Sequence, residues 1–444
     1  MSDGETIDVR DLIRSDDVIA FVIDHVGSLM PWSRFREEPM PAGLAPETMW
    51  EIVEFIRLTG SSFQMPASRT PEEPREDSNW YSVSSEMSAL LTRLLYRSRA
   101  GGTLSARLVQ YRDARADHPF LFADLSAAAT RDGLDISLEA VHLLASKGKE
   151  PSTMDERVVA NAASILESLG EYRDRGFDAP LYGELQTRLD EGCSTLPYRP
   201  LRRPRTSYDA YGDPNGDDPL AKYDSAQKES CLEFIGAHVD PCRQSGPSPI
   251  LAIVLASDLI CEKRPFPRWN AFMEIALRRL SFMRIGLDPL ASVPFSRALL
   301  DWELGVPPAN ELPFAFGSAI LHSRYGNNIT PYIMQLLRFL DRGLDEIERE
   351  ADALVARLEA CRAAVENDCR LNHRQQRLLV RLVMKPTESI DSATYERENG
   401  VTLVTARADL KKLAQMGYLY LSECGKKQVF SPVPHLEKAL LERG

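Results

Sequence analysis

The stretch Ile253–Arg279, IVLASDLICEKRPFPRWNAFMEIALRR, decides the fold that the sequence predicts. Its first part, up to Cys261, is an apolar run of helical length without a helix breaker. Pro265 and Pro267 must end that helix, because proline lacks an N–H donor and restricts the residue before it. A second segment with helical periodicity begins at about Asn270. The stretch therefore predicts two helices joined by a tight Pro-Phe turn, and an anion site where free N–H groups open the second helix.

This hairpin resembles the active-site hairpin of the Fic (Fido) family. In that family a helix ends in His-Pro-Phe, and an acidic residue and Gly-Asn-Gly-Arg precede the second helix. The family's histidine is the general base toward a target hydroxyl, its acid holds Mg²⁺, and its glycine loop and arginine bind nucleotide phosphates. In this chain Pro265, Phe266 and Asn270 match the motif.

The other motif positions differ from the family. Arg264 replaces the histidine, Arg268 the acid, Trp269 and Ala271 the glycines, and Phe272 the arginine. A guanidinium stays protonated and cannot act as a base, and a second one would repel Mg²⁺. Tryptophan lacks the backbone freedom with which glycine wraps around a phosphate. The resemblance therefore implies a pseudoenzyme with no catalytic residues and no metal; the alternative is a protein adenylyltransferase that uses nonstandard residues.

A binding role is still open to this turn. Lys263, Arg264 and Arg268 lie at the predicted helix mouth and form a candidate anion pocket, with Trp269 available to stack on a base. Such a pocket would bind a nucleotide without turning it over, and no resident cofactor is expected. The alternative is that Trp269 and Phe266 simply fill the core.

Two upstream segments extend the resemblance. The family's inhibitory helix carries a Ser or Thr, then a Glu that plugs the nucleotide site, and the corresponding positions here are Ala128, Asp132 and Gly133. With the hydroxyl gone and the acid one methylene shorter, the resemblance implies that the plug is lost together with the active site. Asn161 matches a frequent asparagine of the family's core helix; the alternative role is a hydrogen bond to nearby backbone.

Composition limits the class of protein. The chain has 444 residues, 43% hydrophobic and 27% charged, with a formal charge of −12, which suggests two to three domains and disfavours nonspecific binding to anions by the whole body. Its seven cysteines include no Cys-x-x-Cys pair, so reduced thiols and no zinc are expected. The acidic N-terminus is unlike a signal peptide, and no apolar run spans a membrane. We expect a cytoplasmic protein without a membrane partner.

The first region, residues 1–120, predicts helices separated by Pro-rich loops. His118-Pro119-Phe120 repeats the start of the Fic motif, but no glycine loop follows, so we expect a chance match. A Fic-like helical core is expected over 121–340. Within it, residues 195–220 predict a loop with four arginines and interleaved tyrosines; it either contacts an anion or nucleic acid, or is a solvated loop.

A linker helix is expected over 341–370. Its apolar residues from Leu344 to Val365 recur three and four apart, the a/d seam of a short coiled coil. The seam predicts either a homodimer through residues 341–366 or packing on the chain's own core.

The last region, 371–444, predicts a winged helix. Its order is helix, short strand, helix, a tight turn at Asn399-Gly400, a third helix capped by Thr402, and a two-stranded wing. It resembles the winged-helix tail of many bacterial Fic proteins. The predicted fold class is therefore mainly α: a Fic-like helical bundle followed by a C-terminal winged helix-turn-helix.

The third helix of this region predicts DNA binding. Small and hydroxyl side chains on its outer face leave room for a major groove, and its cations suit phosphates. Residues 371–444 carry 12 Lys and Arg against 8 Asp and Glu, or +4, whereas the rest of the chain carries −16. The candidate DNA contacts are Thr402, Thr405, Arg407, Ala408, Lys411, Lys412, Lys426 and Lys427. The favoured hypothesis is a transcriptional regulator; the alternatives are the adenylyltransferase and a scaffold whose winged helix docks protein.

Overall fold

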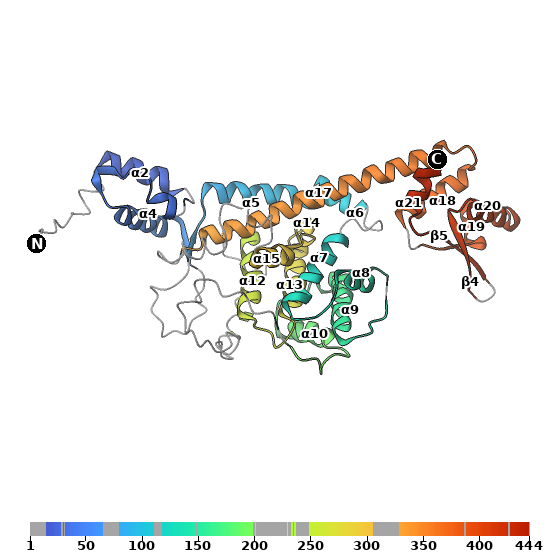
Figure 1. Cartoon of the computed structure of the whole chain (residues 1–444), viewed down its shortest axis with the longest axis horizontal. Coiled ribbons are helices and arrows are strands. Elements are labelled where there is room, and N and C mark those ends of the chain that lie inside the picture. Colours follow the sequence, from blue (N-terminus) through green and yellow to red (C-terminus); the bar gives the residue numbers. More distant parts are fainter. Residues whose placement is uncertain are drawn as a thin grey trace, which may run out of the picture. The chain divides into compact units, whose positions relative to one another are not determined.

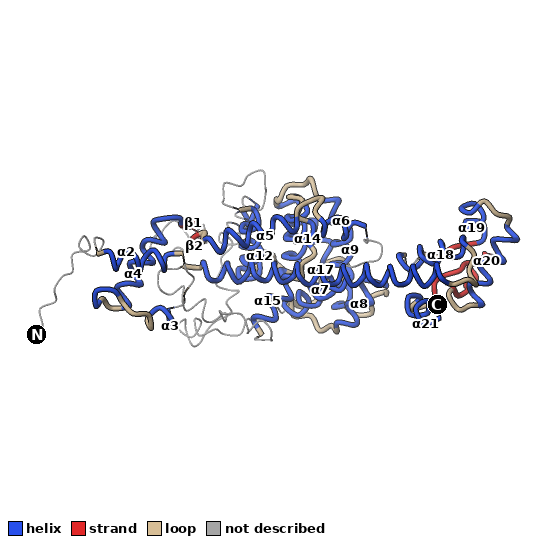
Figure 2. The backbone as a smooth tube through the Cα atoms, turned by 90° about the horizontal axis from the view of Figure 1, so that it is seen from above, coloured by secondary structure: helices blue, strands red, loops and turns tan. Residues whose placement is uncertain are grey.

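The structure is a computed structural model of the whole chain (Figure 1). It describes residues 15–27, 30, 32–64, 80–110, 118–147, 149–198, 200, 229, 232–233, 235–236, 248–304, 328–385, 388–424 and 427–443. Most described residues are helical, and the strands are short, as Figure 2 shows. The predicted class, mainly α, is confirmed at this coarse level.

The N-terminal helices form a small core of their own. Helix α2 (Asp16–Val26) packs against α4 (Pro46–Ser61), with the short α3 (Trp32–Phe35) and the 3-10 turn η1 (Pro41–Gly43) between them in the chain. Their buried core residues are Val18, Val22, Phe35, Leu44, Met49, Trp50 and Val53. Strands β1 (Ser62–Gln64) and β2 (Trp80–Ser82) pair antiparallel, which the sequence pattern did not predict.

The body is built from helices. Their bounds are α5 Ser85–Ser98, α6 Thr103–Gln110, α7 His118–Arg131, α8 Leu138–Lys147, α9 Met154–Glu167, η4 Leu169–Tyr172, α10 Ala179–Leu189, α12 Pro249–Lys263, α13 Asn270–Arg284, α14 Asp288–Ala291, α15 Phe295–Glu303 and α17 Thr330–Asn367. The tripeptide His118-Pro119-Phe120 opens helix α7 and does not form a turn between two helices, unlike the hairpin motif.

Helices α12 and α13 pack against each other, and the predicted helix–turn–helix about Pro265 and Phe266 is confirmed. Arg264 ends α12 with φ +47°, and Trp269 precedes α13 with φ +56°, so both non-glycine residues adopt the left-handed conformation. The apolar side chains of α13 are buried on nearly every side, which places this hairpin at the centre of the body.

Helix α17 is one continuous helix from Thr330 to Asn367, so the linker helix expected over 341–370 begins earlier in the chain than predicted. No helix breaker separates the residues before 341 from the linker, so nothing ends the helix there. The predicted seam is buried by the chain itself: Leu344, Ile347, Ala351, Leu354, Cys361 and Val365 are all buried. Burial of these side chains within one chain agrees with the alternative that the seam packs on the chain's own core.

The N-terminal half of α17 runs beside α5, as Figures 1 and 2 both show. Arg93 and Arg97 of α5 form ion pairs with Asp341, and Glu86 pairs with Arg338.

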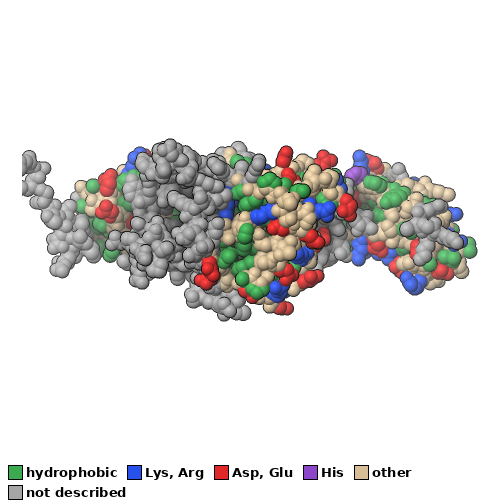
Figure 3. Space-filling model, turned by 90° about the horizontal axis from the view of Figure 1, so that it is seen from below, with side chains coloured by type: hydrophobic (Ala, Val, Ile, Leu, Met, Phe, Trp, Pro, Cys, Tyr) green, Lys and Arg blue, Asp and Glu red, His purple; other side chains and the backbone are tan. Residues whose placement is uncertain are grey.

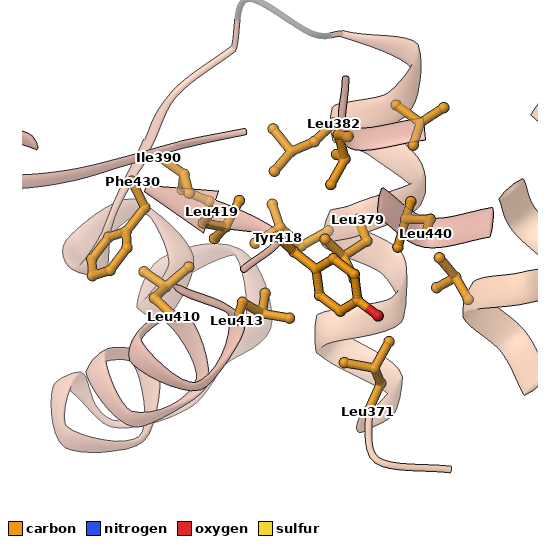
Figure 4. Packing of buried hydrophobic residues seen from close by; sticks show 14 of the residues in the cluster. Leu371, Leu379, Leu382, Ile390, Leu410, Leu413, Tyr418, Leu419, Phe430 and Leu440 are labelled. Carbon is orange, nitrogen blue, oxygen red and sulfur yellow. The ribbon is translucent and has the colours of Figure 1, made fainter. Parts of the chain in front are cut away.

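The C-terminal elements occur in the predicted order. They are α18 His373–Met384, β3 Ile390–Asp391, α19 Ser392–Asn399, α20 Leu403–Gln415, β4 Leu419–Cys424, β5 Lys427–Pro432 and a further helix α21, Leu436–Arg443, that was not predicted. The strands form an antiparallel sheet in the order β3-β5-β4. Leu379, Leu410 and Leu413 pack against Tyr418 and Phe430 in its core (Figure 4).

Contacts divide the chain into two compact units: residues 1–100 with 120–344, and residues 101–119 with 345–444. This division differs from the boundaries expected at 120, 340 and 370, because α6 and the second half of α17 belong with the C-terminal elements. Among the described residues, no helix combines the length and the apolar character that crossing a bilayer requires.

Candidate functional site

The first backbone N–H groups of helix α13, where the sequence predicts an anion site, donate to a carboxyl group of the same protein. Both carboxylate oxygens of Asp132 accept from the backbone N–H of Ala271, at 3.2 and 3.1 Å, and one also accepts from Phe272, at 3.2 Å. Asp132 follows the last residue of α7 and is buried. Contrary to the expectation that the shortened acid is lost as a plug, its carboxylate reaches the helix mouth.

Tyr198 completes this cluster from the segment after α10. Its hydroxyl donates to Asp132 at 2.9 Å and accepts from the side-chain amide of Asn270 at 3.2 Å. Burial raises the pKa of Asp132 to about 6, against the opposing effect of the hydrogen bonds from Ala271 and Tyr198. Burial and the Asp132 carboxylate also raise the pKa of the Tyr198 phenol, so Tyr198 remains a donor at neutral pH.

Asn270 fixes the shape of the Pro-Phe turn. Its side-chain oxygen accepts from the Phe266 N–H at 2.9 Å, and its side-chain nitrogen donates to the Phe266 carbonyl at 2.9 Å. Both residues are buried, and the ring of Phe266 meets Tyr182 edge to face. Asn270 therefore satisfies backbone groups that proline leaves without helical partners.

Arg268 and Trp269 both contact Asp190, the residue that ends helix α10. Arg268 pairs with the Asp190 carboxylate at 2.9 Å, and the Trp269 ring nitrogen donates to the same carboxylate at 2.7 Å. Arg268 also donates to the backbone carbonyls of Ser194 and Leu196, at 2.9 and 2.5 Å. The guanidinium lies 4.5 Å from the centre of the Trp269 ring.

These contacts place the predicted pocket residues in structural roles. Trp269 is completely buried, which agrees with the core-filling alternative, and Arg268 binds carbonyl groups and Asp190. Arg264 forms the left-handed end of α12 and is half-buried, and the Lys263 side chain lies outside the described residues. Pro265, Ala271 and Phe272 are buried.

Asp190 and Tyr198 are the two residues of this cluster that sequence reasoning missed. Each contacts the hairpin from more than 70 positions away, at separations of 79 and 72 residues, and no local pattern marks such a partner. Asn161 has the alternative role given above: its amide donates to the carbonyls of Leu189 and Glu191, at 3.1 and 2.9 Å. The loop arginines at 199, 202, 203 and 205 lie outside the described residues.

Helix α20 is the second candidate site, and its exposed face differs slightly from the predicted one. Arg407, Ala408 and Lys411 are exposed, and within the described residues the two cations take part in no ion pair. Thr402 is exposed and accepts from the Thr405 N–H at 3.3 Å, the predicted N-cap. Gly400 has φ +62° in the predicted turn before the helix.

The other predicted DNA contacts fall into two groups. Thr405 is half-buried. Lys412 is exposed, and its ammonium group donates a hydrogen bond to the Arg370 carbonyl. Lys426 lies outside the described residues, as does the side chain of Lys427.

A buried carboxylate anchors the inner side of α20. Asp409 accepts from Asn372 at 2.8 Å and from the Arg374 guanidinium at 3.0 and 2.9 Å, so α20 is tied to the start of α18. Tyr395 of α19 donates to the same carboxylate at 3.3 Å. The negative charge of Asp409 is therefore paired with Arg374 inside the module, and it does not pair with the exposed Arg407 or Lys411.

Among the described residues, no three His, Cys, Asp or Glu side chains lie close enough together to hold a metal ion. No protein-family model matches the chain, and no curated protein is significantly similar to it.

Proposed function

We propose that this chain is a DNA-binding regulatory protein: a C-terminal winged helix binds the duplex, and a Fic-like helical body does not transfer nucleotides. The observation that carries the proposal is the exposed face of α20, where Arg407 and Lys411 lie one turn apart without an ion pair among the described residues. An N-capped helix with a buried inner face and cations on its outer face suits the major groove and the adjacent phosphates.

The order of the C-terminal elements supports the winged-helix assignment. Two helices joined through the Gly400 turn precede an antiparallel hairpin, β4 and β5, and β3 pairs with the returning strand. Asp409 fixes α20 against α18, so the outer face is presented on a rigid element.

The charge distribution also supports DNA as the partner. Residues 371–444 carry a formal +4, in a chain whose total is −12. Figure 3 shows acidic and basic side chains interspersed on the visible described surface, with no broad basic patch on that face. The rest of the chain is acidic, which disfavours nonspecific binding to DNA, so residues 371–444 would provide the affinity for DNA.

The hydrogen bonds at the start of α13 support the proposal that the helical body does not transfer nucleotides. The N–H groups of Ala271 and Phe272, where a phosphate would bind at a helix start, already bond Asp132. Arg264 offers no base, and Arg268 is bound to Asp190 and to carbonyl groups.

Binding of labelled duplex from the chain's own upstream DNA, followed by fluorescence anisotropy over a range of salt, tests the proposal. The double variant Arg407→Glu/Lys411→Glu should weaken binding at least tenfold and flatten the salt dependence, by about one unit of slope for each phosphate that the variant no longer neutralises. The matched control is Arg362→Glu/Lys438→Glu, the same charge change at exposed ion pairs of α17 and α21. No binding at low salt, or equal loss in both double variants, would overturn the proposal.

A further inference from the structure

Val404 is an anomaly on the surface of the C-terminal module. Its side chain is 78% exposed, the highest value among the large hydrophobic side chains in the described part of the chain. It lies in the first turn of α20, two residues after the cap Thr402. A β-branched residue is a weak helix former, and an exposed one buries no apolar surface, so the fold gains nothing from valine here.

The surroundings of Val404 match the face already described. At about 100° per residue, Val404 shares a stripe with Ala408 and Lys411, and Arg407 lies beside it. The stripe therefore combines one apolar side chain at the start of the helix, a small residue that allows close approach, and two cations.

The backbone under Val404 is held firmly. Thr402 caps the helix, and Ala406, Leu410 and Leu413 bury its inner side. The exposure of Val404 is thus a property of an ordered helix start, where recognition helices present side chains to base edges.

We propose that Val404 is a specificity-determining residue that contacts the C5-methyl group of thymine in the major groove. This rests on the proposed function. The thymine methyl is the one apolar group that the edges of the unmodified bases offer in that groove, and it suits an apolar side chain. The two cations flanking Val404 favour a polyanion over an apolar protein surface as the occupant, because an apolar surface docked there would bury both cations without partners.

Replacing thymine by deoxyuracil tests the contact, because it removes only the methyl group. The preferred duplex is first selected from a random-sequence pool with the full chain, and each thymine is then replaced in turn. Removing one buried methyl group should weaken wild-type binding by about threefold to tenfold at one or two positions. Val404→Ala should bind the thymine duplex more weakly and lose the discrimination, so that thymine and deoxyuracil duplexes bind it equally.

Leu441→Ala is the matched control: an exposed aliphatic residue on α21, whose truncation should leave the thymine preference unchanged. Wild-type protein that binds both duplexes equally, or Val404→Ala that still discriminates, would reject the role of Val404 while leaving DNA binding intact. Failure to select any duplex would instead reject the proposed function itself. A thermal unfolding curve for Val404→Ala that overlays the wild-type curve excludes a folding defect.

Discussion

Asp132 binds the backbone of Ala271 across 139 positions of the chain, with N–O distances of 3.2 and 3.1 Å. A carboxylate from the end of one helix thereby satisfies the opening of another, the role that an N-cap normally performs within its own helix. Asp124, within α7, does the same for α15, accepting from the Ser296 N–H at 2.8 Å. The body of this protein is thus held together at two helix openings by acids from a single segment.

Replacing Asp132 with alanine should destabilise the protein by about 2–4 kcal/mol, because buried N–H groups of Ala271 and Phe272 and the Tyr198 hydroxyl lose their acceptor. Urea unfolding at neutral pH measures this loss. Asp135→Ala, at an exposed side chain three residues on, is the control and should change stability by less than about 0.5 kcal/mol. Similar losses in the two variants would contradict the role of Asp132.

The contribution of Asp132 should depend on pH. Its pKa is about 6 in the folded chain, against an ordinary value of 3.8 for an aspartate. The folded state therefore binds this proton more tightly than the unfolded state does. The extra stability that protonation of Asp132 gives, which adds to that of its hydrogen bonds at neutral pH, is complete below the unfolded pKa and is lost as pH rises through the folded pKa. The full loss corresponds to about 3 kcal/mol.

Comparison with Asp132→Asn, which cannot titrate, isolates this group from the other carboxylates. The stability advantage of the wild type over this variant should shrink between about pH 4 and about pH 7.5, as measured by urea unfolding at a series of pH values. An advantage that stays constant or grows would show that burial does not raise this pKa.

Asn270→Ala should destabilise the Pro-Phe turn locally, with a smaller effect on the global stability of the chain. The Phe266 N–H would lose the side-chain oxygen that accepts its hydrogen bond, and its hydrogen exchange should accelerate by about tenfold or more, as the loss of one hydrogen bond implies. The Arg264 amide bonds the Ile260 carbonyl within α12 and serves as the internal control, with unchanged protection. Equal acceleration at both amides would mean global destabilisation and would count against a local lock.

Arg278 should be among the costliest residues to replace. It is completely buried and bonds Glu274 at 2.7 Å and Asp124 at 2.5 Å. Arg278→Met should therefore lose about 3–5 kcal/mol, because buried carboxylates are left without their partner. Arg297→Met, which breaks a partly exposed pair with Asp301, should lose less than about 1 kcal/mol in the same unfolding assay.

Millimolar MgATP should leave the unfolding temperature unchanged, since Asp132 occupies the N–H groups that a phosphate would use. Labelled ATP should likewise transfer no label to candidate target proteins. Transfer that Arg264→Ala or Asn270→Ala abolishes would revive the adenylyltransferase alternative.

Local chemistry carried most of the successful sequence predictions. The hairpin about Pro265 and Phe266, the Gly400 turn and the Thr402 cap each depend on neighbouring residues, and all three are present. The continuity of α17 was recoverable too, because its sequence contains no stop signal before Asn367. The buried spacing of Leu436 and Leu440 could have revealed α21.

The partners of the site residues were beyond sequence reasoning. A charged residue such as Arg268 suggests an anion, yet most of its acceptors are backbone carbonyls more than 70 positions away, which no side-chain pattern encodes. Trp269 in a left-handed conformation was also unpredictable, because residues other than glycine rarely adopt it. The winged-helix and Fic-like assignments stay proposals, which the DNA-binding and label-transfer experiments test.

The paired hydrogen bonds between Asn270 and Phe266 bear on how distant relatives of this hairpin can be recognised. These two hydrogen bonds require only the amide side chain of Asn270 and the backbone of Phe266, so the side chains around them take no direct part in holding the turn. A search pattern built on Pro-Phe with an asparagine four residues after the phenylalanine, and with apolar helices on both sides, should therefore find hairpins that a pattern requiring a histidine before Pro-Phe misses.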